Sequence, residues 1–224
     1  MTEPLKLVIF DVDGTLIDSQ DHILAAMNHA FAAVGHDAPA RRDVLSIVGL
    51  SLPEAIARLA PQFDPALQDA IVTAYKQSFN TQRLASHPPL FPGARQALDD
   101  LAGREDVLLG VATGKSRRGL DHILAVYGLE GHFFTRQVAD DHPSKPNPSM
   151  ILAALAETGV APARAIMVGD TTFDIDMGRA AGIRTLGVTW GYHPEAALRA
   201  AGPDALIGDY TQIGPTLEQL WRLA

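Results

Sequence analysis

The sequence predicts an α/β protein, a doubly wound parallel sheet of the Rossmann-like kind, with an all-helical segment inserted after the first strand. Three observations support this prediction. Residues 5–10 form a short apolar run, rich in branched and aromatic side chains, which is typical of a buried strand. Residues 18–85 show helical periodicity only, and helices and strands alternate after residue 86. Because alternating βα units indicate a parallel sheet with helices on both faces, the helical block is an insertion into the core.

The insertion is bounded by capping residues and by a proline-rich break. Asp18 or Ser19 can cap its first helix, and Gly35 can end it. The expected helices cover residues 18–34, 41–48, 51–59 and 65–83. Residues 86–93 contain three prolines and are a candidate hinge. We therefore expect two domains, an α/β core of residues 1–17 and 86–224 and a helical cap of residues 18–85.

The elements of the core follow in regular order. The expected strands cover residues 107–112, 133–138, 165–168, 185–188 and 205–207. The expected helices cover residues 93–102, 116–126, 148–158, 173–181, 194–200 and 211–222. Gly128 is placed to end the second of these helices.

Composition excludes several classes of function. The chain of 224 residues is 47% hydrophobic and has a formal charge of −8, so a nucleic-acid or anionic-membrane surface is not expected. The absence of cysteine excludes disulfides, zinc–thiolate sites and thiol nucleophiles, and it fits a cytoplasmic location. The first residues lack the pattern of a signal peptide, and no apolar run is long enough to span a membrane.

Polar side chains follow the expected strands, at the point where each strand ends. The carboxyl ends of parallel strands lie on one edge of a sheet, so these residues should converge. They are Asp11 and Asp13 after the first strand, Thr113 and Gly114 after the second, Lys145 after the third, and Asp170 and Asp174 after the fourth. Carboxylates can hold Mg²⁺, whereas a hydroxyl, an amide and an ammonium can hold a phosphoryl group.

The motifs formed by these residues resemble those of the haloacid dehalogenase-like hydrolase superfamily. Asp11-Val12-Asp13-Gly14-Thr15 is similar to its first motif, Thr113 to its second, Lys145 to its third, and Gly169-Asp170-Thr171-Thr172-Phe173-Asp174 to its fourth. The helical insertion resembles the type 1 cap of that superfamily. Leu90-Phe91-Pro92-Gly93 and Gly187-Val188-Thr189-Trp190-Gly191-Tyr192 are most similar to phosphoglycolate phosphatase-like members.

The resemblance implies a role for each of these residues in a Mg²⁺-dependent phosphatase. Asp11 would be the nucleophile that forms an aspartyl-phosphate, and Asp13 would be the general acid and base. The implied metal ligands are Asp11, Asp13 through its backbone carbonyl, Asp170 and Asp174. The implied phosphate-binding groups are Thr113, Gly114 and Lys145. The expected substrate is a small phosphorylated metabolite, phosphoglycolate or similar, acted on by a monomer or homodimer.

Other functions of the same residues remain open. A sugar phosphomutase resembling β-phosphoglucomutase would use the same core and the same aspartates. A signalling receiver domain also combines carboxylates, a threonine and a lysine on a parallel sheet, but in a different order. The resemblance also disfavours dehalogenation, because the dehalogenase members of the superfamily lack the second aspartate, whereas Asp13 is present here.

Several further residues are expected to have no part in catalysis. Residues 114–116 do not make a phosphate-binding P-loop, because Leu109 stands where that motif needs glycine, and Lys115 is then expected at the surface. Lys76 and His22 are likewise expected at the surface, since each lies on a helix of the insertion. Phosphonatase relatives form a Schiff base with a lysine of the cap, and a surface position of Lys76 disfavours that chemistry here.

The sequence gives further expectations for the loops. Residues 189–192 are expected to serve packing. His142 is either close to the site or an ordinary loop residue, and residues 49–51 either break a helix or help to select the substrate. Asp140 and Asp141 are expected to cap or orient the loop of Lys145 rather than to bind metal.

Overall fold

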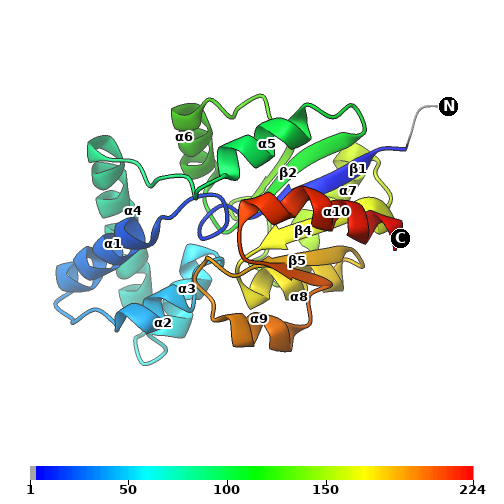
Figure 1. Ribbon diagram of the computed structural model, residues 1–224. Helices are drawn as coiled ribbons and strands as arrows, with labels where there is room; N and C mark the ends of the chain where they lie inside the picture. Colours follow the sequence, from blue (N-terminus) through cyan, green and yellow to red (C-terminus); the bar gives the residue numbers. More distant parts are fainter. Residues whose placement is uncertain (1–3, 224) are drawn as a thin grey trace.

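The computed structural model describes residues 4–223 and is built on a six-stranded parallel sheet (Figure 1). The strands are β1 (Lys6–Phe10), β2 (Val107–Thr113), β3 (Phe133–Val138), β4 (Ala165–Gly169), β5 (Arg184–Val188) and β6 (Ala205–Ile207). Their order is β3-β2-β1-β4-β5-β6, so the chain winds outward from β1 in both directions. Because β1 pairs with both β2 and β4, the loops after these three strands meet at the topological switch point.

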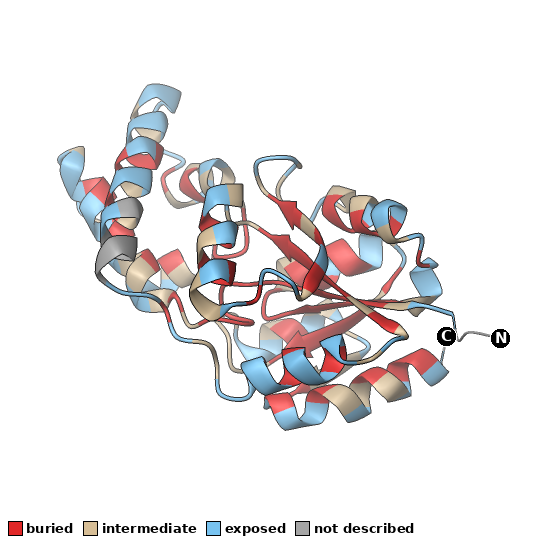
Figure 2. Ribbon diagram, turned by 90° about the horizontal axis from the view of Figure 1, so that it is seen from above, coloured by how far each residue is buried: buried red, intermediate tan, exposed pale blue. Residues whose placement is uncertain are grey.

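Helices cover both faces of the sheet. One face carries α5 (Ala94–Ala102), α6 (Arg117–Tyr127) and α10 (Ile213–Arg222), and the other carries α7 (Ser149–Thr158) and α8 (Thr172–Ala180), with α9 (Glu195–Ala201) packed on α8. Alternate residues of β1 serve the two cores. Val8 and Phe10 belong to the first, and Leu7 and Ile9 to the second. This double burial explains the unbroken apolar run, and Figure 2 shows the strands as the most deeply buried part.

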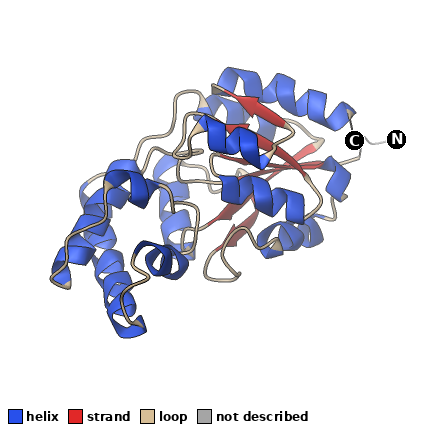
Figure 3. Cartoon of the chain, turned by 90° about the horizontal axis from the view of Figure 1, so that it is seen from below, coloured by secondary structure: helices blue, strands red, loops and turns tan. Residues whose placement is uncertain are grey.

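The segment between β1 and α5 is helical and forms a separate body beside the sheet (Figure 3). It consists of α1 (Gln20–Ala33), α2 (Arg41–Leu45), α3 (Leu52–Leu59) and α4 (Pro65–Ala85). Its own apolar cluster includes Met27 and Phe31 of α1, Ile56 of α3 and Ile71 of α4. The predicted fold class is therefore confirmed. The domain boundaries at residues 17/18 and 85/86 stay a prediction, and we refer to this helical segment as the cap.

Most helices lie within one or two residues of their expected ends, and two of the differences have a clear local cause. The helix expected over residues 41–48 ends at Leu45, because the following amides of Ile47 and Val48 bond three residues back and the chain then turns at Gly49, where φ is +99°. The last helix begins at Ile213 rather than at residue 211, after a single 3₁₀ turn. Asp209 caps that turn by accepting a hydrogen bond from the Thr211 amide at 2.9 Å.

Within residues 4–223, none of the helices combines the length and the apolar character that a membrane crossing requires.

Candidate active site

The loop after β1 is locked to the neighbouring strand and leaves Asp11 at the switch point. The Asp11 amide donates to the Val168 carbonyl of β4 at 2.9 Å, which continues the strand pairing by one residue. The side chain of Asp11 is buried. Gly14 then turns the chain at φ +86°, and a Cβ there would lie 2.2 Å from the Asp170 carboxylate. Only glycine therefore allows the loop to approach Asp170 this closely.

Three carboxylates gather beneath this loop. Asp11, Asp170 and Asp174 are all buried, and each offers an oxygen within 4.8 Å of the others. We call them the carboxylate cluster. Thr15 Oγ1 donates to Asp170 at 2.9 Å, and Thr171 at the start of α8 donates to Asp174 through its amide at 3.0 Å and its hydroxyl at 2.7 Å. The hydrogen bonds fix two of the three carboxylates and leave Asp11 with a different partner.

That partner is Lys145, whose ammonium lies 2.7 Å from Asp11 Oδ1 and 2.7 Å from Asp174 Oδ1. The Lys145 side chain is fully buried. Burial alone would lower its pKa, but the charges of Asp11 and Asp174 outweigh that effect and raise it above the ordinary value. Lys145 is therefore cationic, and the site holds one cation against three carboxyl groups.

Burial and the excess of negative charge raise the pKa values of Asp11 and Asp170. Burial, helped by the Asp174 charge, raises the pKa of Asp11 to about 7 against the opposing effect of Lys145. Burial, followed by the charges of Asp174 and Asp11, raises the pKa of Asp170 well above its usual range. Three carboxyl groups this close favour either a shared proton or a bound cation.

The cluster fits a divalent metal ion with oxygen ligands. Asp11 Oδ2 is the one side-chain polar atom, among the buried groups described in residues 4–223, that has no hydrogen-bond partner. An orphaned carboxylate oxygen beside two further carboxylates is the donor set that Mg²⁺ prefers. Asp13 contributes no carboxylate oxygen to this cluster.

Asp13 has a separate environment. Its Oδ1 accepts a hydrogen bond from Ser19 Oγ at 2.5 Å, and Lys115 Nζ lies 2.9 Å from Oδ1 and 2.8 Å from Oδ2. Both Asp11 and Asp13 line the pocket, so the adjacent aspartates share one opening with different partners. The two side chains can therefore act differently on one bound molecule.

The ion pair with Asp13 corrects the prediction for Lys115. This lysine was expected at the surface, but its side chain is only 8% exposed and lines the pocket. The reason is tertiary: β1 and β2 are neighbours, so the loops that follow them face each other across 102 residues of sequence. The sequence did contain a signal for this position, because Lys115 follows the end of β2 by two residues and β2 is the neighbour of β1.

The loop after β2 closes the site on the other side. Thr113 is buried at the end of β2, and both Thr113 and Gly114 line the pocket. A Cβ at residue 114 would lie 2.4 Å from the Leu50 carbonyl and 2.5 Å from the Gly49 carbonyl. Gly114 therefore permits direct backbone contact with the cap. Residues 49–51, left open by the sequence, thus reach the pocket and are more than a helix break.

Residues 189–192, which follow β5, make hydrogen bonds to several residues of the site. The Tyr192 amide donates to Asp170 Oδ2 at 2.8 Å, and the Tyr192 hydroxyl accepts from the Ser19 amide at 2.8 Å and lies 3.1 Å from Ser19 Oγ. Trp190 Nε1 donates to the Thr15 carbonyl at 3.1 Å. This segment was expected only to pack. It also orients both the carboxylate cluster and the loop of Asp13, a role for which the sequence offered no signal.

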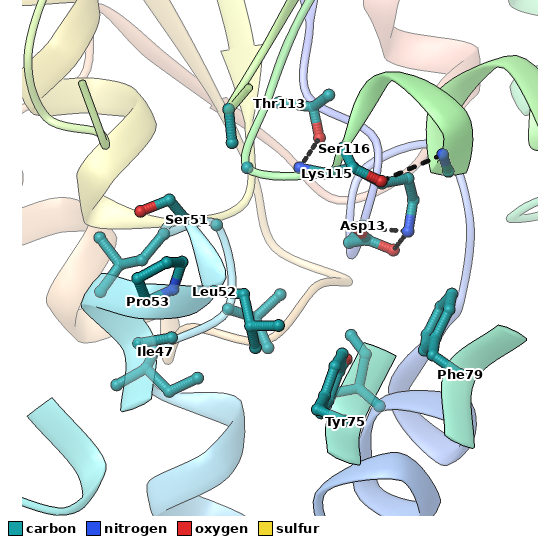
Figure 4. A pocket seen from close by; sticks show the side chains of 18 of the residues that line it. Asp13, Ile47, Ser51, Leu52, Pro53, Tyr75, Phe79, Thr113, Lys115 and Ser116 are labelled. Atoms are coloured by element: carbon teal, nitrogen blue, oxygen red, sulfur yellow. Dashed lines mark hydrogen bonds and ion pairs between the residues drawn. The ribbon is translucent and has the colours of Figure 1, made fainter. Parts of the chain in front are cut away.

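A pocket of about 450 Å³ opens above these residues, between the sheet edge and the cap (Figure 4). Tyr75 and Phe79 of α4 face it with nearly stacked rings, whose centroids are 5.7 Å apart. Ile47 and Leu52 contribute apolar surface near the start of α3. Lys76 is exposed, as predicted, but it also lines the pocket. The cap therefore supplies much of the wall that a substrate would meet.

The histidines weighed in the sequence lie outside the pocket lining. His22 is partly exposed rather than fully exposed, and its ring lies 3.0 Å from Ser86 in the connection back from the cap. His142 bonds Ser149 and Gln137, each at 2.8 Å, and so braces its own loop.

Asp140 and Asp141 fasten the start of α6. Asp140 accepts a hydrogen bond from the Arg117 amide at 2.7 Å, and Asp141 pairs with the Arg117 guanidinium at 2.6 Å. Their carboxylates are therefore directed at α6 and not at the carboxylate cluster.

The placement of the predicted site residues can now be stated. Asp11, Asp170, Asp174 and Lys145 come together in one buried group, and Asp13, Thr113 and Gly114 line the pocket beside it. Lys145 does not reach the pocket lining and contacts carboxylates instead. A parallel sheet with a buried acidic cluster at its carboxyl edge, beside a pocket under a helical insertion, defines a capped, Rossmann-like α/β protein with a candidate metal-binding site.

Comparison with known proteins gives the family. A model of haloacid dehalogenase-like hydrolases matches residues 8–188. The probable phosphatase IndB of Dickeya dadantii is 35% identical over 222 residues, covering 97% of this chain and 96% of the relative. A phosphoglycolate phosphatase of Haemophilus influenzae is 29% identical, covering 95% and 98%. A solved structure of a predicted phosphoglycolate phosphatase from Haemophilus somnus has a TM-score of 0.85 at 23% identity, covering 96% and 99%, which shows the fold.

The chain belongs to the haloacid dehalogenase-like hydrolase family. The predicted resemblance and the expectation of a phosphatase are confirmed at the level of family and reaction class.

Proposed function

We propose that this protein is a Mg²⁺-dependent phosphatase that hydrolyses a small phosphomonoester through a phosphorylated Asp11. The observation that carries the proposal is Asp11 Oδ2, a buried carboxylate oxygen without a hydrogen-bond partner on a residue that lines the pocket. The other oxygen of Asp11 is held by Lys145, so the carboxylate has one fixed and one available oxygen. Because a carboxylate has two oxygens, Asp11 can hold the metal ion with one and attack phosphorus with the other.

In the first step, an Asp11 oxygen forms a bond to phosphorus while the bond from phosphorus to the ester oxygen breaks. Asp13, on the pocket wall, gives a proton to the departing oxygen, which leaves as an alcohol. In the second step, Asp13 takes a proton from a water molecule, which attacks phosphorus and releases phosphate and free Asp11. Thr113 and the Gly114 amide line the same space and can donate to the phosphoryl oxygens.

The carboxylate cluster would hold the metal ion through Asp11, Asp170 and Asp174, with the Asp13 carbonyl as a further ligand. When bound, Mg²⁺ supplies positive charge that offsets the repulsion between an anionic nucleophile and an anionic substrate. Lys145 contributes by fixing Asp11 and Asp174 toward each other. In this chain its role is thus positioning of carboxylates, in addition to the phosphate binding that the resemblance implied.

Relatives with phosphatase names and the mixed lining of the pocket support a small phosphorylated metabolite as substrate, and phosphoglycolate is the first compound to test. We further propose a cytoplasmic location, which the cysteine-free sequence fits, and a monomeric or homodimeric state. A phosphomutase would use the same aspartates. A phosphorylated receiver domain is disfavoured by the family.

The test is a screen of phosphate release with and without Mg²⁺ over phosphoglycolate, sugar phosphates, nucleotides and pyrophosphate. We expect release that needs Mg²⁺ and that is lost in Asp11→Asn and Asp13→Asn proteins of unchanged fold. Near-normal release by Asp11→Asn would refute the proposal. Isomerisation of a sugar phosphate in excess of phosphate release would indicate the mutase.

A further inference from the structure

The side chain of Lys115 joins three parts of the molecule at the pocket. Its ammonium contacts both carboxylate oxygens of Asp13, at 2.9 and 2.8 Å. The same ammonium lies over the ring of Phe79 of the cap, 5.2 Å from the ring centre. Its backbone stands between the end of β2 and the start of α6. Figure 4 shows Lys115 bonded to Asp13, with Phe79 next to the pair.

The stem of Lys115 is fixed, so its ammonium is held in place. The Lys115 amide donates to Thr113 Oγ1 at 3.2 Å, and its carbonyl accepts from the Ala139 amide at 3.2 Å. A Cβ at Gly119 would lie 2.9 Å from Lys115 Cγ, so glycine at that position leaves room for the stem against α6. A packed stem reduces the rotamer freedom that a lysine normally keeps at a surface.

We propose that Lys115 is a positioning residue for Asp13, an inference that rests on the proposed function of Asp13 in proton transfer. Contact with both oxygens fixes the plane of the carboxylate at the pocket wall, and the hydrogen bond from Ser19 fixes its rotation. Without Lys115, the Asp13 carboxylate keeps the hydrogen bond from Ser19 but loses the contact that fixes its plane, so it can tilt away from the leaving oxygen. General acid–base catalysis depends steeply on such placement.

The contact with Phe79 extends this function to the cap. Since α4 places an aromatic ring against the ammonium that holds Asp13, the position of the cap and the orientation of Asp13 are coupled. A cap displaced from the core would loosen Lys115, and with it the proton-transferring group.

The rival explanation is that Lys115 binds the substrate directly. Loss of a substrate-binding cation raises KM, whereas misplacement of Asp13 lowers kcat. The dependence of the rate on the leaving group also distinguishes the two explanations. An alkyl phosphate needs its departing oxygen protonated, whereas p-nitrophenyl phosphate releases a stabilised phenolate and depends less on an acid.

The experiment compares Lys115→Met with Lys115→Arg and with Lys76→Met, the last of which removes a positive charge from the same pocket without touching the Asp13 ion pair. For an alkyl phosphate we expect Lys115→Met to lower kcat by about tenfold to hundredfold, part of the usual acid–base contribution, with KM within about twofold. The loss should be smaller for p-nitrophenyl phosphate. Lys115→Arg should recover much of kcat, because a guanidinium can bind both carboxylate oxygens.

Lys76→Met should not reproduce this dependence on the leaving group. Phe79→Leu should lower kcat in the otherwise unaltered protein and have little further effect in Lys115→Met, because both changes act through one ammonium. A rise of KM with kcat unchanged in Lys115→Met, or additive effects of the two changes, would overturn the positioning role.

A crystal structure of Lys115→Met gives a readout that does not depend on any substrate. We expect the Asp13 carboxylate to leave its present position while the carboxylate cluster stays in place. An unmoved Asp13 would refute the inference even if the enzyme were active. Absence of phosphate release by the unaltered protein would instead count against the proposed function.

Discussion

Lys145 and Asp11 form a buried ion pair, with the ammonium 2.7 Å from Asp11 Oδ1. The pair joins residues 134 positions apart in the chain, and both side chains are almost inaccessible to solvent. Removing a charge from water is costly unless it is compensated, and Lys145 compensates two carboxylates at once. The third, Asp170, is left without a cationic partner in this group. The site therefore has more carboxyl groups than cations, and we expect the stability of the protein to depend on pH and on bound cations.

Asp11 should make the metal-free protein less stable as pH rises. Its pKa is about 7 in the folded protein against an ordinary value of 3.8, so between these values the folded state keeps a proton that the unfolded state releases. The stability from this group is therefore present below about pH 4 and is lost as pH rises through about 7. Thermal unfolding in chelator should show a smaller decline in Tm from pH 5 to pH 8 for Asp11→Asn than for the unaltered protein.

The magnitude should be several degrees, because about 1 kcal/mol moves Tm by about 2–4 °C in a domain of this size. Asp69→Asn, which removes an exposed carboxylate on α4, is the control and should follow the unaltered protein. Equal declines for all three proteins would contradict the assigned pKa of Asp11.

Mg²⁺ should stabilise the protein through the carboxylate cluster. A ligand at about 100 times its Kd stabilises the state that binds it by about 2.7 kcal/mol. We expect Tm at pH 8 to rise with Mg²⁺ concentration in the unaltered protein, and this response to be largely lost in Asp170→Asn, which lacks one cluster carboxylate. A full response in Asp170→Asn would place the metal ion elsewhere.

Gly114→Ala should impair activity through the cap. The new Cβ would lie within 2.5 Å of two backbone carbonyls of the cap loop, which are unable to rotate away as a side chain would. The cap must therefore shift, and we expect kcat/KM to fall by about tenfold or more, the scale of misplaced catalytic geometry. Gly131→Ala is the matched control, since nothing lies within 4 Å of a Cβ there. Unaltered kinetics of Gly114→Ala would show that the cap contact has no part in turnover.

Tyr192→Phe should weaken the support of Ser19 without opening a cavity. The change removes a hydroxyl that accepts from the Ser19 amide at 2.8 Å and lies 3.1 Å from Ser19 Oγ. We expect a loss of stability of about 0.5–1.5 kcal/mol, typical of a hydrogen bond, and a several-fold lower kcat, because Ser19 also bonds Asp13. Denaturant unfolding and steady-state kinetics measure the two effects. A loss of stability with an unchanged kcat would show that the support of Ser19 by Tyr192 has no part in catalysis.

The sequence by itself determined the architecture and most of the chemistry. The apolar run of β1, the alternation after residue 86 and the helical block before it suffice for a capped parallel sheet, because burial on both faces demands continuous apolar strands. Asp11, Thr113 and Asp170 were found by the same reasoning, since polar residues at strand ends must meet at one edge.

Only the tertiary structure decided which charges pair. Lys145 contacts carboxylates, Lys115 is drawn in to Asp13, and Tyr192 reaches Ser19 across 173 residues. These choices depend on the distances and the burial that strand order and cap position create, because an ion pair or hydrogen bond forms only where both partners arrive within about 3 Å of each other. The cap residues that line the pocket depend on tertiary structure in the same way. Their helical periodicity specified a fold, and their position over the sheet edge made them a pocket wall.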